Sequence, residues 1–466
     1  MTTTTTTPAR LPAEWFKLGA IFITIFIACW AIALWYWRRT DHSPGTGELA
    51  LGLLVFPLGV LFALWSSQKA IMARAASIPA STSKPASSTP RADAAPSTPV
   101  LAMVATALRS PYGTSAEELA SAIADNEARA DLDKELVDDK GFPVMTARSD
   151  DAHDEALQDE IADWLSSQGL LVHLSEEQWR ALTLASGVAA ELGSIAASDV
   201  LPCEENPPTL QLSLMLPKDW PADIRRAATM WLKHTVSRYG WPEASIAVHE
   251  APEYDHTSPA SIITRLMPGT SAGNAPMVAL VIACASLIGQ ESIDRLAAQS
   301  SLFTSSQSGG QIPGEGAAGL LLTDLKLAQA CCAEFSLLDP ITERRRDTSA
   351  DDTKRVDASL LLALVEQASK AAAVDISQIS MVVADTAHRP NRVLELMGLS
   401  APAIPQVDAA DDIVRVGLGS GSCGAVPFVT VLALARHYAL ERGAPILCIG
   451  NEDPYLRTAA LVRLPA

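Results

Sequence analysis

The feature that most constrains this chain is a run of twenty residues near its N-terminus that contains no charged side chain. The run, residues 18–37, reads LGAIFITIFIACWAIALWYW, and its aromatic residues gather just before Arg38 and Arg39. A membrane-spanning helix needs about 20 consecutive apolar residues, and Trp and Tyr are enriched at the membrane–water interface. The run therefore predicts a transmembrane helix.

A second apolar run follows closely, over residues 49–65 (LALGLLVFPLGVLFALW). It contains Pro57, which membrane helices tolerate, and Ser43-Pro44-Gly45 between the runs is a turn signal. The first run is too long for a cleavable signal peptide, and a second span follows it at once. A buried helical hairpin of a soluble protein remains the alternative. The charge-free lengths favour a transmembrane hairpin, with spans 18–37 and 49–65 in a membrane anchor of residues 1–76.

Basic residues around the hairpin predict its orientation. Four of them flank the two spans, and two lie in the loop between the spans: Arg10, Lys17, Lys69 and Arg74 outside, Arg38 and Arg39 inside the loop. Because Lys and Arg are enriched in cytoplasmic segments, both ends of the hairpin are expected in the cytoplasm. The rest of the chain is then expected to face the cytoplasm from the inner (cytoplasmic) membrane.

Charge divides the chain into two unequal parts. Residues 77–99 consist mostly of Ser, Pro, Ala and Thr, which predicts a flexible linker over 77–100. Residues 1–92 hold eight basic and three acidic side chains, so the net charge of −18 for the whole chain leaves −23 for the remainder. A body this acidic is not expected to bind nucleic acid.

Cysteine and acidic patterns indicate no metal site. The seven cysteines are scattered and include no CxxC pair, which argues against a zinc site or a disulfide framework. Two acid-rich stretches, 131–139 and 150–160, are interpreted as solvated faces or loops rather than ion sites. Ser115 and Glu118 have the spacing of a helix capping box.

The body has the pattern of an α/β protein. We expect two domains, an acidic α/β domain over 101–270 and a second domain over 271–466. In the first, a strand over 210–216, a helix over 220–239 and a strand over 244–249 form one β-α-β unit. In the second, strands are expected at 277–287, 312–322, 379–385, 413–416, 445–449 and 459–464, with helices at 359–373 and 426–441.

The second half of the body resembles a known family. The segments ALVIACASLIG, SGGQIPGEGAAGLLLTD and VVADTAHRPNRVLEL, followed by the glycine-rich stretch that begins at Gly417, resemble the C-terminal half of thiolase-fold β-ketoacyl synthases. The resemblance is strongest over 313–318 (PGEGAA) and 417–450, and it covers roughly 209–466. It implies a degenerate thiolase-like fold, a mixed sheet layered with helices.

The catalytic residues of that family are not found at the expected places. The resemblance implies a Cys nucleophile at a helix N-terminus and two His residues. Cys203 lies in an acidic, proline-rich segment that would raise a thiol pKa, and His388 is near the first His position without its usual surroundings. Cys423 stands near the second His position, at a helix start, where it is either an activated thiol or a small residue for tight packing. We therefore expect no catalytic residues and a non-catalytic fold.

A glycine motif allows one further interpretation. Gly419, Gly421 and Gly424 match the dinucleotide-binding spacing G-x-G-x-x-G, and Glu452 or Asp453 could then bind a ribose. The alternative is a glycine turn needed for close packing. Only one β-α-β unit remains before the chain ends, and the motif alone is weakly specific, so no cofactor is expected.

The whole chain resembles the type VI secretion lipase-adaptor family, because it combines an N-terminal anchor, a low-complexity linker and a ketosynthase-like body without the catalytic set. The resemblance implies a membrane-anchored adaptor that binds a phospholipase effector and loads it onto the secretion spike protein. The acidic body would then steer basic surfaces of a protein partner. The alternative is a ketosynthase-like enzyme that transfers or binds acyl groups at the membrane.

Overall fold

The structure, a computed structural model, describes residues 99–203, 208–250, 257–267, 276–352, 356–399 and 403–465. The predicted spans 18–37 and 49–65 and nearly all of the predicted linker lie outside these residues. The described residues all belong to one compact unit. Its architecture is a large mixed sheet layered with helices, as the sequence predicts.

Five strands make the first half of the sheet, in the order β5-β4-β6-β7-β1. Strand β4 is parallel to β5 and β6, and β7 is antiparallel to both of its neighbours. Helix α7 connects β4 to β5, so the predicted β-α-β unit is confirmed. The bounds are β1 Leu101–Arg109, β4 Leu210–Met215, α7 Ala222–Ser237, β5 Ile246–Glu250, β6 Val278–Ser286 and β7 Glu315–Thr323.

The second half repeats the first in strand order and direction. Its order is β11-β10-β12-β13-β8, with β10 parallel to β11 and β12, and β13 antiparallel to β12 and β8. The short strand β9 adds to β13. The bounds are β8 Ser336–Leu338, β9 Thr342–Arg345, β10 Met381–Ala384, β11 Ile413–Arg415, β12 Ile446–Gly450 and β13 Leu456–Arg463. The two halves are therefore topological repeats of one unit.

The repeats join through β1 and β8, which pair antiparallel over Leu101–Met103. The result is a single sheet of eleven strands in the described part of the chain. The boundary expected between domains at residue 270 does not interrupt this sheet, because β4 on one side of it pairs with β6 on the other. The acidic first segment and the thiolase-like second segment thus share one sheet.

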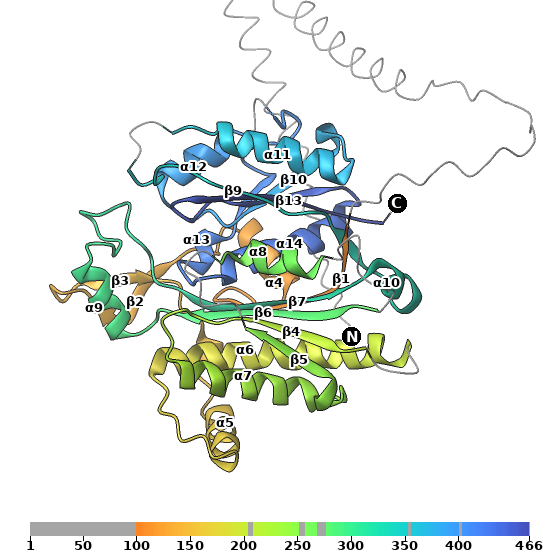
Figure 1. Cartoon of the computed structure of the whole chain (residues 1–466). Helices are drawn as coiled ribbons and strands as arrows, with labels where there is room; N and C mark the ends of the chain where they lie inside the picture. The colour runs from red at the N-terminus through yellow and green to blue at the C-terminus, as the bar shows by residue number, and fades with distance from the viewer. Residues whose placement is uncertain are drawn as a thin grey trace, which may run out of the picture. The chain divides into compact units, whose positions relative to one another are not determined.

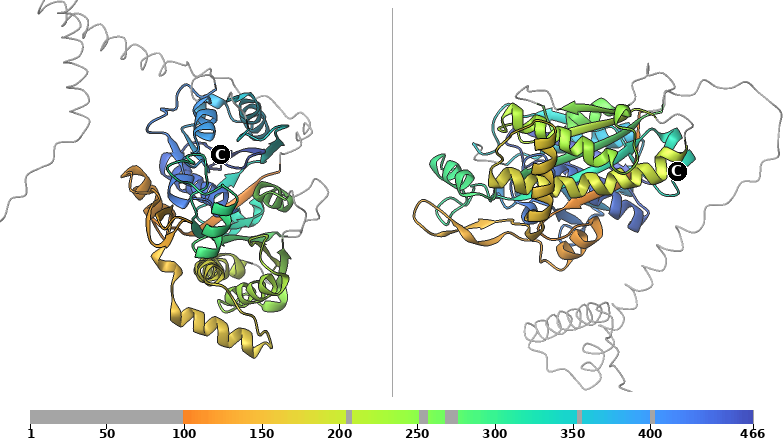
Figure 2. Two further views of the ribbon diagram at one scale, coloured as in Figure 1. Left: turned by 90° about the vertical axis from the view of Figure 1, so that its left-hand side faces the viewer. Right: turned by 90° about the horizontal axis from the view of Figure 1, so that it is seen from below.

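Helices form three layers around the two halves of the sheet (Figure 1). Helices α6 and α7 cover the outer face of the first half, which the view from below shows directly (Figure 2). Helices α11 and α12 cover the outer face of the second half, and α4, α8, α13 and α14 lie between the halves (Figure 1). The bounds are α4 Ala116–Ala124, α6 Glu176–Ile195, α8 Pro259–Leu266, α11 Ser359–Ala372, α12 Pro390–Met397, α13 Gly417–Ser420 and α14 Val426–Arg442.

The remaining elements lie at the periphery. Strands β2 and β3 form a separate two-stranded sheet that projects from one side together with α9, and α5 lies beneath α7 (Figure 1). Helix α10 follows β7. The bounds are β2 Asp131–Val137, β3 Pro143–Thr146, α5 Glu155–Ser167, α9 Gln290–Ala298 and α10 Leu325–Cys331.

Continuous apolar runs become the buried centre of the fold. Every position of β6 and β7 is buried, as the runs predict, because helices cover both faces of these strands. Helix α14 is buried on nearly all sides, since it lies between the two halves. The strands and helices expected in the second half are all present within a few residues of their predicted bounds.

One described segment is long and apolar enough to cross a membrane by length and composition, residues 176–200, which contain α6. Its most apolar window is 61% buried inside the protein, and α6 packs on β1, β6 and β7. Gly319 of β7 lets it come close, because a Cβ at that position would lie 2.7 Å from both Leu192 and Val188. The segment is therefore accounted for as a core helix.

The acid-rich stretches are mostly exposed, with one exception in β2. Asp133 is buried and accepts hydrogen bonds from Arg148 at 2.9 and 3.0 Å and from Thr146 at 2.7 Å. Burial alone would raise the pKa of Asp133, but these hydrogen bonds hold the pKa well below its usual range. Ser115 caps α4 as predicted, whereas the Glu118 carboxylate accepts from Thr114.

Candidate functional site

A cavity of about 1250 Å³ lies where strands from both halves end. Its lining includes the residues that follow the carboxyl ends of the parallel strands β4, β6, β10 and β12. The first turns of α8, α9 and α14 complete the walls. Ligand sites in α/β proteins commonly lie at the carboxyl ends of parallel strands, which makes this cavity the candidate functional site.

The N-terminus of α8 opens into the cavity. Helices α8 and α14 hold equivalent places in the two repeats, since α8 lies between β5 and β6 and α14 lies between the corresponding strands β11 and β12. Ser258 is the N-cap of α8, and its hydroxyl accepts a hydrogen bond from the Ser261 amide at 3.0 Å. Sequence reasoning missed this residue, although Ser258-Pro259 is a helix-start signal. A helix N-terminus in the cavity thus carries a hydroxyl, which is already engaged as a cap.

The glycine-rich loop before α14 is packed against another stretch of backbone. The Ser422 amide donates to the Ile312 carbonyl at 2.7 Å, and the Ser422 carbonyl accepts from Gly314 at 3.2 Å. Gly421 has a φ of +60°, and a Cβ on it would lie 2.8 Å from the Ile312 carbonyl oxygen. These glycines serve close packing, which is the alternative that the sequence left open. The space where a pyrophosphate would approach Gly421 is filled by the 312–314 backbone.

The thiols of the cavity are not activated. Burial, followed by the nearby Glu315 carboxylate, raises the pKa of Cys423, and its thiol donates to the Ser420 carbonyl at 3.4 Å. Of the two interpretations that the sequence leaves open for Cys423, the structure favours the small residue for tight packing over the activated thiol, because the helix start is enclosed by protein. Burial also raises the pKa of Cys284, on β6, to about 12. Since the thiolate is the nucleophilic form, neither cysteine is reactive at neutral pH.

The other two residues compared with the family's catalytic set are not among the residues that line the cavity. Cys203 ends the short 3-10 helix Leu201–Cys203 that follows α6. His388 lies edge-on to the ring of Phe303, with 4.8 Å between ring centroids. Burial and the adjacent Arg389 lower the pKa of His388. Of these three residues, only Cys423 lines the cavity, so the structure does not bring them together in one site.

Asp385 is the carboxylate that sequence reasoning missed. It follows β10 directly, lines the cavity, and accepts hydrogen bonds from the Asn451 and Glu452 amides at 2.8 and 3.0 Å. Burial raises the pKa of Asp385 to about 7, and the neighbouring Glu452 adds to this increase. A group with such a pKa exchanges protons near neutral pH. A lone Asp after a strand carries no distinctive sequence signal, so only the structure reveals its position.

Glu315 of the PGEGAA motif has a structural role, because hydrogen bonds engage both oxygens of its carboxylate. The Glu315 carboxylate is fully buried and accepts from both Nε and Nη2 of Arg180, at 2.8 and 2.5 Å. It also accepts from the Ser149 amide at 2.7 Å and the Ser286 hydroxyl at 2.9 Å. Glu315 therefore ties β7 to α6, to β6 and to the segment after β3.

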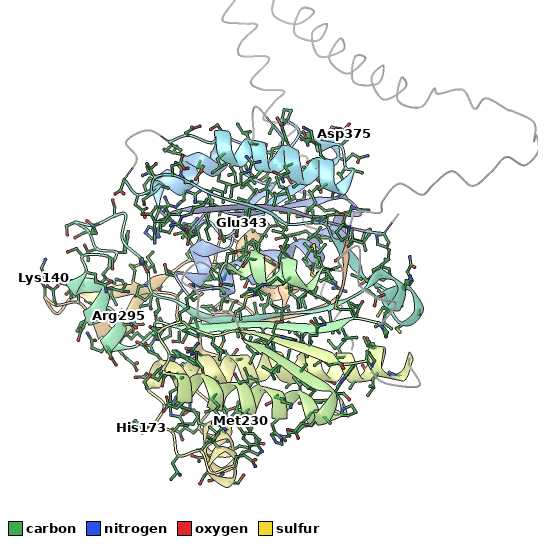
Figure 3. The ribbon with its side chains drawn as sticks, in the orientation of Figure 1. Lys140, His173, Met230, Arg295, Glu343 and Asp375 are labelled. Carbon is green, nitrogen blue, oxygen red and sulfur yellow. The ribbon has the colours of Figure 1, made fainter. Side chains whose placement is uncertain are left out.

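Charged and apolar side chains both line the cavity. Figure 3 labels two of the charged ones, Arg295 on α9 and Glu343 on β9, which belong to different halves of the molecule. Acidic side chains are more numerous than basic ones. The acidic residues are Glu177, Asp219, Glu291, Glu343, Asp385, Glu452 and Asp453, and the basic residues are Lys218, Arg225, Arg295 and Arg345. In the described ranges, no group of three or more His, Cys, Asp or Glu side chains is placed to hold a metal ion.

Comparison with known proteins identifies relatives of the fold. No family model and no curated protein matches the sequence. Among solved structures, a chain from a type II polyketide synthase complex of an acyl-carrier protein with its ketosynthase is 12% identical, with a TM-score of 0.55. The match covers 79% of this chain and 100% of that one.

Two further ketosynthases give the same result. The ketosynthase from module 6 of the bacillaene synthase of Bacillus subtilis is 12% identical with a TM-score of 0.53, covering 79% of this chain and 72% of that one. The ishigamide ketosynthase/chain length factor is 17% identical with a TM-score of 0.51, covering 79% and 100%. At these identities the likeness concerns the fold alone. Residues of the described body therefore adopt a thiolase/ketosynthase-like fold, as the motifs at 313–318 and 417–450 predict.

Proposed function

We propose that this chain is a non-catalytic adaptor built on a ketosynthase-like fold. The observation that carries the proposal is the composition of the cavity. None of its described lining residues is a histidine, and its two cysteines, Cys284 and Cys423, are buried with raised pKa values. Acyl transfer by an enzyme of this fold needs an activated nucleophile. Without one, the ketosynthase-like architecture serves as a scaffold for binding.

The partner that we propose is a phospholipase effector, which the chain would load onto a type VI secretion spike protein. This proposal rests on the resemblance of the whole chain to the lipase-adaptor family. The predicted anchor would hold the body at the inner membrane, facing the cytoplasm, where an effector is synthesised. The net charge of −23 beyond residue 92 supports electrostatic attraction of a basic partner surface.

Affinity purification from the native bacterium tests the proposal. The full-length chain with a C-terminal tag, expressed from its own locus, is expected to recover a phospholipase and a spike protein, identified by mass spectrometry. A tagged chain that lacks the predicted anchor, residues 1–76, should recover the same partners from the soluble fraction of the cells. Recovery of neither a lipase nor a secretion component would overturn the proposed function.

An acyl-transferring or acyl-binding enzyme is the second candidate. It is favoured by the large cavity and by Asp385, whose pKa of about 7 suits proton transfer. A thiol-reactive acyl analogue separates the two candidates. On the adaptor proposal, the two cysteines that line the cavity, Cys284 and Cys423, stay unmodified in the folded protein because both are buried. Saturable labelling of either native cysteine would favour the enzyme.

A further inference from the structure

The volume of the cavity indicates the size of its occupant. At about 1250 Å³ it exceeds the roughly 300–1,000 Å³ that is usual for small-molecule sites. Its lining comes from both repeats, from the end of β4 to the turn between β12 and β13. A cavity of this extent can accept a stretch of polypeptide.

Part of the wall is apolar. Trp220 and Phe428 both line the cavity, and 7% and 6% of their surfaces, respectively, remain exposed. Ile262 and Leu287 are half-buried beside them on the lining. An occupant that presents apolar side chains would remove this surface from water and gain free energy.

The acidic side chains of the lining fall into two groups. Asp219 is compensated by Arg295 at 3.1 Å, and Glu452 by Arg389 at 3.3 Å. Five others form no salt bridge with a basic side chain of the described residues: Glu177 and Asp385, whose pKa values are raised by burial, and Glu291 on α9, Glu343 on β9 and Asp453 after β12. The nearby basic group of Arg345 is directed onto the ring of Tyr455, 4.5 Å from its centroid. With seven acidic and four basic side chains, Lys218 and Arg225 included, the lining has a formal net charge of −3.

We propose that this cavity binds a basic, partly apolar polypeptide segment of a partner protein. Lysine or arginine side chains of the segment lie against Glu291, Glu343 and Asp453, and its apolar side chains lie against Trp220 and Phe428. The inference rests on the proposed function in one respect, that the partner is a protein. Complementary charges supply specificity and a fast association rate, and the small exposed apolar surface of the wall adds to the affinity.

The test uses the full-length chain and a fluorescent peptide of alternating lysine and leucine, with binding measured by anisotropy. A peptide with glutamate in place of lysine is the comparison ligand. The variant Glu291→Gln, Glu343→Gln, Asp453→Asn removes three of the negative charges that have no salt bridge, while keeping side-chain size and the hydrogen bonds that Asp453 accepts. It should weaken binding of the lysine peptide roughly tenfold, since each exposed charge pair contributes modestly.

A matched control removes the same charge elsewhere. The variant Glu117→Gln, Asp159→Asn, Asp163→Asn changes three exposed acidic residues of α4 and α5 that do not line the cavity. It should bind the lysine peptide within about twofold of the unchanged chain, because long-range attraction alone is screened by salt. Equal thermal unfolding midpoints for the two variants show that both are folded.

Three outcomes would overturn the inference. They are equal binding of the glutamate peptide, unchanged affinity in the cavity variant, and equal losses in the cavity and control variants. The outcome also separates this inference from the proposed function. If the cavity variant still recovers a phospholipase as well as the control variant does, the partner binds elsewhere and only the inference fails. If the peptide binds as expected but no effector is recovered, the inference stands and the proposed function fails.

Discussion

Replacing Glu315 with alanine should destabilise the body more than any other single carboxylate removal considered above. The side chain is fully buried, and its two oxygens accept four hydrogen bonds, two of them from Arg180. Arg180 is itself 5% exposed, so its charge would lose its counter-ion without gaining water. The buried Ser149 amide would also lose its acceptor.

The magnitude follows from these contacts. Removing one partner of a buried ion pair costs about 3–5 kcal/mol, and leaving a buried amide without a partner costs about 1–3 kcal/mol. The terms overlap, so we expect a loss of about 4 kcal/mol in the free energy of unfolding. Against a usual total of about 5–15 kcal/mol, this is a large fraction of the stability.

Urea unfolding of the full-length chain, followed by tryptophan fluorescence, measures the effect. Glu343→Gln is the control and should change the free energy of unfolding by less than about 0.5 kcal/mol, because Glu343 is partly exposed. The double variant Arg180→Met, Glu315→Met should lose less than the sum of the two single variants, since no charge is stranded. A loss below about 1 kcal/mol for Glu315→Ala would refute the reasoning.

Three further predictions concern the cavity and its glycine loop. Burial raises the pKa of Asp385 to about 7, so the folded state keeps a proton that the unfolded state releases near pH 4. The free energy of unfolding should therefore fall as the pH rises from about 4 to 7. Asp385→Asn should flatten this pH dependence, measured by thermal unfolding. Native Cys423 should resist iodoacetamide at pH 8 and react only after unfolding, and rapid native alkylation seen by mass spectrometry would contradict its raised pKa. Gly421→Ala should lower the free energy of unfolding by about 1–3 kcal/mol or more. The φ and ψ of Gly421, +60° and −159°, are essentially restricted to glycine, and the Ile312 carbonyl is close. Gly443→Ala, where nothing crowds the Cβ, should cost less in the same unfolding assay.

The parts of the fold that the sequence predicts are those with a strong local signal. Strands β6 and β7 and helix α14 are continuous apolar runs, and the glycine loop marks where α14 begins. No helix or strand is predicted at 101–109 or 176–195, although both stretches are largely apolar and become the buried elements β1 and α6. Their many small residues suit close contact with the sheet, but that role is visible only when the sheet is present.

The candidate site was only partly predictable for a related reason. The glycine loop is found at its expected place, yet its chemistry depends on other parts of the chain. Burial and then Glu315 of β7 raise the pKa of Cys423, and the 312–314 backbone fills the space beside Gly421. Ser258 and Asp385 lie on other elements, which meet at the cavity only because strands from both repeats end there. No sequence pattern links residues that are brought together by strand order alone.

The place of β1 in the sheet has a consequence for how the chain is made. It is the first described strand to be synthesised, but its two neighbours are β7 and β8, which end at Thr323 and Leu338. Ribosomes add about 5–20 residues per second, so β1 waits on the order of ten to fifty seconds with both edges unpaired. An open apolar strand is an aggregation hazard during that interval. Chaperone occupancy of nascent chains should therefore begin at residues 101–109 and end only after β8 has left the ribosome.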